Sequence, residues 1–136
     1  YEKRFNGLKK INRKNLYFSN SEISKNIKKL DPNVKKAINL AFDRIFKFHK
    51  RQKFYGFNIK DKYQNTFAYR SNPIKKVGVY VPGGKASYPS SVLMNCIPAL
   101  IAGVKEIFMT VPASKNNINP GVLYAAKKCK IKKFIK

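Results

Sequence analysis

The sequence lacks tryptophan and has only one histidine and two cysteines among its 136 residues. Cys96 and Cys129 lie far apart and do not form the CxxC spacing that is typical of zinc and redox sites. We interpret both as small buried hydrophobic residues of a reduced, cytosolic protein. His49 falls near the end of a predicted helix, where a helix-end or packing role is favoured over a catalytic one. These residues predict no metal site.

Acidic residues are also scarce, with only six Asp and Glu in the chain. No two of them have the spacing that general acid and base catalysis by paired carboxylates requires. All six are interpreted as surface, cap or turn residues: Glu2, Glu22, Asp31, Asp43, Asp61 and Glu106. The sequence therefore predicts no catalytic residue within this chain.

The shortage of acids leaves a formal charge of +24, which would attract nucleic acid or an anionic surface. However, 25 of the 30 basic residues are Lys, whereas proteins that read nucleic acid favour Arg for bidentate contacts. The chain also holds 14 Asn and 13 Ile, an enrichment typical of an AT-rich genome. Drift of the amino-acid composition is therefore favoured as the cause of the high charge, and a basic nucleic-acid-binding module is kept as the alternative.

Long hydrophobic runs are missing as well. Residues 86–104 carry no charge over 19 positions, but Pro89, Pro98 and several polar residues interrupt them. This segment suits a buried helix better than a membrane span, and no signal peptide is visible. We expect a cytoplasmic protein without membrane contact. Because the chain stops within a predicted strand, we also expect it to be a fragment.

Residues 1–72 are predicted to form an N-terminal helical region. Ser19 or Ser21 caps a first helix, and Asp31 followed by Pro32 begins a longer amphipathic helix that runs to about Lys53. Its predicted apolar face consists of Val34, Ala37, Ile38, Ala41, Ile45 and Phe48. After this helix, strand residues are expected at Tyr63, Phe67 and Tyr69.

Residues 73–136 are predicted to form the first part of a second, α/β domain. Strands are expected at 77–81, 106–111 and 131–135, with starts separated by roughly thirty residues, the size of a βαβ unit. Ser90 or Ser91 caps a helix that ends at Gly103, and Asn119-Pro120 begins another that runs to Lys128. The spacing predicts a parallel βαβαβ sheet with right-handed crossovers.

Ligands of such sheets bind beyond the carboxyl ends of the strands, where this chain has Pro82, Gly83 and Gly84. The loop fits neither the GxxxxGK[ST] nor the GxGxxG phosphate-binding pattern. Its glycines still allow a ligand to approach the backbone closely. By strand alternation, Tyr80 points away from Val79 and Val81. It is either an ordinary sheet aromatic or a flat ring presented to a ligand.

The stretch "VGVYVPGGKASYPSSVLMNCIPALIAGVKEIFMTVP" closely resembles the cofactor-domain signature of the histidinol dehydrogenase family. Three further segments resemble segments of the family and follow one another in the family's order: "YEKRFNG", with Asn6 in place of the family's Asp, "IFKFHKRQ" and "NPIKKVGVYVPGG". The resemblance covers the whole chain.

This resemblance implies an NAD- and zinc-dependent enzyme that oxidises L-histidinol to L-histidine through the aldehyde, histidinal, with two NAD. It implies a homodimer whose cofactor domain is an incomplete, aldehyde-dehydrogenase-like Rossmann fold. Matched position by position, Tyr80, Pro82, Gly83 and Gly84 are implied to contact NAD, and Ser90 to lie near the substrate. The family's zinc ligands and Glu-His pair are expected beyond Lys136, so the chain alone is predicted to be inactive. A relative that kept the fold and lost the chemistry is a further alternative.

Overall fold

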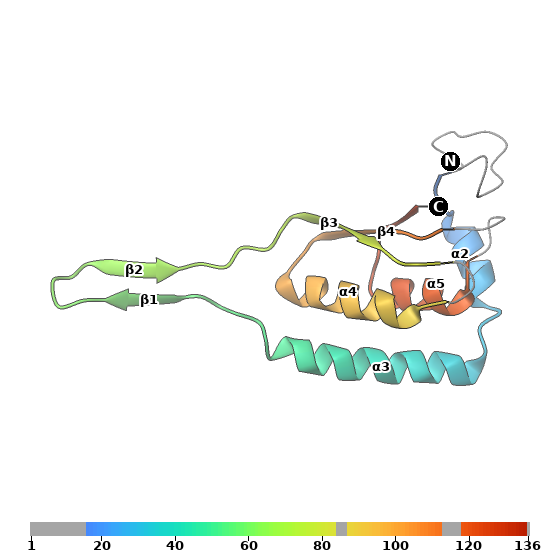
Figure 1. Ribbon diagram of the computed structural model, residues 1–136, viewed down its shortest axis with the longest axis horizontal. Coiled ribbons are helices and arrows are strands. Elements are labelled where there is room, and N and C mark those ends of the chain that lie inside the picture. The colour runs from blue at the N-terminus through green and yellow to red at the C-terminus, as the bar shows by residue number, and fades with distance from the viewer. Residues whose placement is uncertain (1–15, 84–86, 113–117, 136) are drawn as a thin grey trace.

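The computed structural model describes residues 16–83, 87–112 and 118–135, and shows an α/β fold with two small sheets (Figure 1). The predictions for Asn6 and Gly84 lie outside these residues. The elements, in chain order, are α2 (Asn20–Ile27), α3 (Pro32–Lys50), β1 (Phe57–Lys60), β2 (Thr66–Tyr69), β3 (Lys76–Tyr80), α4 (Pro89–Ala102), β4 (Glu106–Thr110), α5 (Pro120–Lys128) and β5 (Lys133–Ile135).

Helix α2 begins at a capping box, in which two residues satisfy each other's backbone amides. The Glu22 backbone N–H donates to the Ser19 hydroxyl at 3.2 Å, and the Ser19 backbone N–H donates to the Glu22 carboxylate at 2.7 Å. Of the two predicted caps, Ser19 is therefore the one that the structure uses, and Ser21 lies inside the helix.

Helix α3 begins as predicted, because the Asp31 carboxylate accepts hydrogen bonds from the backbone N–H groups of Asn33 and Val34. It ends at Lys50, three residues before the predicted end. Ile38 is buried, and Ala41 and Ile45 pack against the core. Phe48 was predicted on this face but is 63% exposed. It lies ten positions from Ile38, which at 3.6 residues per turn points it about a quarter turn away.

Strands β1 and β2 form an antiparallel hairpin that projects away from the helices (Figure 1). Phe67 and Tyr69 lie in β2 as predicted. The prediction of Tyr63 as a strand residue is wrong, because Tyr63 lies in the turn. There the Asp61 carboxylate accepts backbone hydrogen bonds from Tyr63 and Asn65, at 2.8 and 2.9 Å, which closes the turn.

The second sheet is parallel in the order β3-β4-β5, as the spacing of the predicted strands required. Val79 is the register partner of Met109, and Met109 of Phe134. All three side chains are buried under α4 and α5, which cover one face of the sheet, while α3 packs on the outer side of these helices (Figure 1). Within the described residues, no helix covers the opposite face.

Helix α4 starts earlier than predicted. Its N-cap is Tyr88, without a side-chain cap bond, and both predicted caps, Ser90 and Ser91, lie in its first turn. The reason is Pro89, whose fixed φ suits the first helical position. Gly103 ends the helix with a φ of 92°, and Asn119 caps α5 through the Gly121 backbone N–H; both were predicted.

Cys96 in α4 and Cys129, the residue after α5, are free thiols with no exposed surface, which confirms their predicted packing role. Of the helices in the described ranges, none has the length and apolar character needed to cross a membrane.

Candidate cofactor-binding edge of the parallel sheet

The carboxyl ends of the parallel strands meet at one edge, and the pairing continues slightly beyond them. The Val81 N–H donates to the Thr110 carbonyl at 2.9 Å, and the Val111 N–H donates to the Ile135 carbonyl at 3.2 Å. The chain therefore leaves β3 and β4 side by side, and the segments that follow them, at Pro82 and Pro112, begin next to each other.

Gly83 is where the two segments touch. A Cβ atom added to Gly83 would lie 2.9 Å from the carbonyl oxygen of Pro112, closer than side-chain carbons approach backbone oxygen. Contact between the loops is thus a structural reason for glycine at this position, in addition to the close approach of a ligand. Pro82 is exposed beside it, and Gly84 lies outside the described residues.

Tyr80 is 62% exposed, whereas its neighbours Val79 and Val81 are 7% and 0% exposed. The predicted alternation is confirmed, and the Tyr80 ring belongs to the sheet face that α4 and α5 leave open. Two residues not singled out from the sequence share this face. Thr110 is the register partner of Tyr80, and Gly78 has open space where a side chain would stand. Only the register shows that Thr110 lies beside Tyr80.

Ser90 is exposed in the first turn of α4, so it stands at the same edge as the β3 loop. The start of α5 lies next to it, because a Cβ on Gly121 would be 3.3 Å from the Pro89 ring. Two helices thus begin together at this edge. Their first-turn amides and dipoles give it positive potential, which favours an anionic ligand.

Among the residues that the structure describes, no acid or base suited to catalysis stands at this edge. In the ranges 16–83, 87–112 and 118–135, no three His, Cys, Asp or Glu residues gather closely enough to hold a metal ion. The described groups with clear pKa shifts lie elsewhere, and they are Asp61, Cys96 and Cys129; the hydrogen bond with Cys129 lowers the pKa of Cys96. Hydrogen bonds from Asn65 lower the pKa of Asp61 in the hairpin turn, and the neighbouring Cys96 thiol and burial raise the pKa of Cys129.

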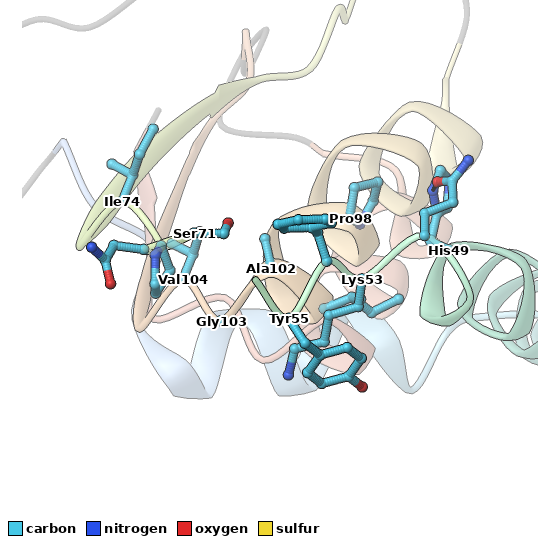
Figure 2. Close-up of a pocket in the computed structure, with 14 residues that line it drawn as sticks. His49, Lys53, Tyr55, Ser71, Ile74, Pro98, Ala102, Gly103 and Val104 are labelled. Atoms are coloured by element: carbon cyan, nitrogen blue, oxygen red, sulfur yellow. Dashed lines mark hydrogen bonds between the residues drawn. The ribbon is translucent and has the colours of Figure 1, made fainter. Parts of the chain in front are cut away.

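A cavity of about 690 Å³ lies at the other end of the sheet, between the carboxyl ends of α3 and α4 and the segment before β3 (Figure 2). His49 and Gln52 of its wall share a hydrogen bond of 2.6 Å between Nδ1 and Oε1. This contact agrees with the helix-end role predicted for His49. The cavity and the candidate edge are therefore separate features.

Comparison with known proteins identifies the family. The family described as "Histidinol dehydrogenase" matches residues 1–136. The histidinol dehydrogenase of Pelagibacter ubique is 53% identical over 136 residues, which are 98% of this chain and 30% of that protein. The enzyme of Syntrophotalea carbinolica is 44% identical over 93% of this chain and 29% of its own length.

The crystal structure of histidinol dehydrogenase from Elizabethkingia anophelis superposes with a TM-score of 0.91 at 34% identity, over 100% of this chain and 31% of that one. The chain thus spans about 30% of the relatives that it matches, the share expected of a fragment. These matches give no support to the nucleic-acid alternative. The chain belongs to the histidinol dehydrogenase family.

Proposed function

We propose that this chain forms the NAD-contacting edge of a histidinol dehydrogenase, which oxidises L-histidinol to L-histidine through histidinal with two NAD. The family match over residues 1–136 supports the activity. The main support for an NAD site here is the exposed Tyr80 ring, which lies at the carboxyl edge of a parallel sheet, beside the start of a helix. A cytoplasmic homodimer is part of this proposal.

The parallel β3-β4-β5 sheet with its two crossover helices supports an incomplete Rossmann-like domain, of the aldehyde-dehydrogenase-like kind. A full doubly wound domain has helices on both faces. Here α4 and α5 cover one face, and the face of Tyr80 is open within the described residues. In this arrangement the dinucleotide lies at the carboxyl edge, where the Tyr80 ring stands on the open face.

The residues present fit NAD by their chemistry. The Tyr80 ring offers an aromatic surface on which a ring of NAD stacks. Pro82 and Gly83 bring the protein backbone close to NAD. The start of α4, with Ser90 in its first turn, offers positive potential to a pyrophosphate. When bound, NAD supplies the acceptor for the hydride of the substrate. The residues of this chain bind and orient it, and Ser90 stands toward the substrate.

Zinc does not fit the described residues, because they hold no cluster of possible ligands. We therefore assign no zinc ligand and no catalytic base to them. We expect the 136-residue chain alone to bind neither NAD nor zinc tightly. With L-histidinol and NAD, the purified chain is expected to form no NADH, followed by absorbance at 340 nm; formation of NADH would contradict this expectation.

The activity is tested in a chimera in which this chain replaces the matching 30% of the Pelagibacter ubique enzyme. The chimera is expected to reduce NAD with L-histidinol and to restore growth of a histidine auxotroph. A chimera that folds and binds zinc but forms no NADH would contradict the proposal.

A further inference from the structure

Gly78 lies inside strand β3, where glycine is unfavourable because it loses more conformational freedom on folding than any other residue. Gly56 and Gly103 have a positive φ, which favours glycine at their positions. Gly83 has its contact with Pro112. Gly78 has neither reason, because its φ is not positive and a Cβ added there would meet no described atom within 4 Å.

A β-bulge does not account for Gly78 either. A bulge inserts an extra residue into one strand, whereas β3 pairs with β4 residue by residue from Lys76 to Tyr80. An unbulged glycine within a strand marks a place where a ligand or another backbone closely approaches the sheet. The open space at Gly78 thus points to an occupant that approaches the open face of the sheet.

This open space adjoins Tyr80. Because side chains alternate along a strand, Gly78 and Tyr80 are consecutive positions on the open face. Their register partners on β4 are Phe108 and Thr110. Three of these four positions carry a side chain, and the fourth is empty. We call the empty position, which Tyr80 and Phe108 flank, the Gly78 gap.

Phe108 does not fill the Gly78 gap, since no atom of its ring comes within 4 Å of a Cβ added to Gly78. Its other neighbour on the open face is Lys133, its register partner on β5. The Lys133 Nζ lies 5.8 Å from the centroid of the Phe108 ring, a cation–π contact that stabilises the ring beside the gap. The gap is therefore a fixed feature of the described face.

The size of the Gly78 gap suits a planar ring. Consecutive outward positions on a strand are roughly 6.7 Å apart. A ring stacked on Tyr80 would have its centroid about 4.5 to 7 Å from the Tyr80 ring, which is a similar distance. On the side of β4, Thr110 occupies the neighbouring position. On β3 the neighbouring position is free, so a stacked ring fits above Gly78, where a side chain would collide with it.

We infer that the Gly78 gap admits a planar ring of NAD, which stacks on Tyr80 and lies over the Gly78 backbone. Gly78 is then a residue that determines cofactor affinity through its lack of a side chain. This inference rests on the proposed NAD-contacting edge, and it adds the side of Tyr80 on which the ring lies. Adenine and nicotinamide are both planar aromatic rings, and the experiments below separate them.

The first test is the KM for NAD of the chimera with the Pelagibacter ubique enzyme. Gly78→Val fills the gap and should raise this KM about tenfold, the factor expected for the loss of one stacking contact. The kcat should stay near that of the parent, because Gly78 touches no reacting atom. Gly78→Ala adds a single carbon and should give a smaller rise. An unchanged KM in both variants would overturn the inference.

Lys76→Val is the matched control. Lys76 lies on the same strand and face, one outward position further from Tyr80, and its ion pair with Glu106 is exposed and contributes little. This substitution should leave the KM for NAD unchanged. A rise equal to that of Gly78→Val would show a general effect of β3 and contradict a specific gap. If Tyr80→Ala raises the KM and Gly78→Val does not, the gap is wrong and the NAD-contacting edge stands.

Thermal unfolding of the chimera separates a ligand from a protein segment as the occupant. Without NAD, Gly78→Val should keep or raise the Tm, because its side chain enters open space and favours a strand. The increase in Tm that NAD produces should be smaller than in the parent. A Tm that falls without NAD would show that another part of the protein covers Gly78, against the inference.

Inhibition by ADP-ribose, which contains adenine and lacks nicotinamide, assigns the ring. If Gly78→Val raises its inhibition constant as much as it raises the KM for NAD, adenine occupies the Gly78 gap. If the constant stays unchanged beside a raised KM, nicotinamide does. Both results place a ring of NAD over Gly78. If neither quantity changes, no ring of NAD lies there and the inference is wrong.

Discussion

Gly78 and Gly83 differ in what surrounds them. The sequence places Gly78 inside a predicted strand and Gly83 just after it, and it predicts the direction of Tyr80 correctly, since alternation needs only a strand. It does not show that Gly83 touches Pro112 or that Thr110 stands beside Tyr80. Both facts depend on the register between strands, which local sequence does not encode.

The two glycines give a matched pair of substitutions. Gly83→Ala places a Cβ 2.9 Å from a backbone oxygen, so we expect a loss of about 1 to 3 kcal/mol in the free energy of unfolding. Gly78→Ala places its Cβ in open space and should be neutral or stabilising, because alanine restricts the unfolded chain. Urea unfolding of both variants checks this, and equal effects would argue against the loop contact.

The two cysteines are expected to be unreactive in the folded chain. Both have no exposed surface, so a reagent cannot reach Cys96 even though the hydrogen bond with Cys129 lowers its pKa. The raised pKa of Cys129 in addition keeps its thiol protonated, whereas the thiolate is the reactive form. A thiol reagent at pH 8 should label neither residue in buffer and both in denaturant. Rapid labelling of the native chain would show that the α4–α5 contact is open.

At the scale of elements, predictions succeeded where one residue decides the local structure. Asp31, Asn119 and Gly103 begin or end helices through their own side chain or φ value, and all three were predicted. The start of α4 was missed because Pro89 competes with the two serines that follow. Strand β1 was missed because its residues gain strand structure only by pairing with β2.

The turn of the hairpin is expected to depend on pH. Hydrogen bonds from Asn65, through its side chain first and then its backbone, hold the pKa of Asp61 below its unfolded value. Its contribution to the turn is therefore present above about pH 4 and is lost as pH falls through the folded pKa. Amide shifts of Tyr63 and Asn65 should change there. Asp61→Asn should remove this change; if the change persists in that variant, Asp61 is not its cause.

At the scale of the whole molecule, the spacing of strands and helices predicts the parallel sheet, because each βαβ unit has a characteristic length. The cavity could not be predicted. Its wall combines the end of α3, the segment 71–74 and the end of α4, which meet only after α3 packs on α4. The charge of +24 was the most prominent feature of the sequence, yet the family match gives it no role in binding.

The most direct test of the NAD-contacting edge is the KM for NAD of the chimera with the Pelagibacter ubique enzyme. Tyr80→Ala removes an exposed ring at the carboxyl edge and should raise this KM about tenfold, the factor that corresponds to losing one stacking contact of about 1.4 kcal/mol. Tyr80→Phe keeps the ring and should stay near the parent. Tyr63→Ala removes a more exposed ring, in the hairpin turn, and should leave the KM unchanged. An unchanged KM for NAD in Tyr80→Ala, with the fold intact, would contradict the account.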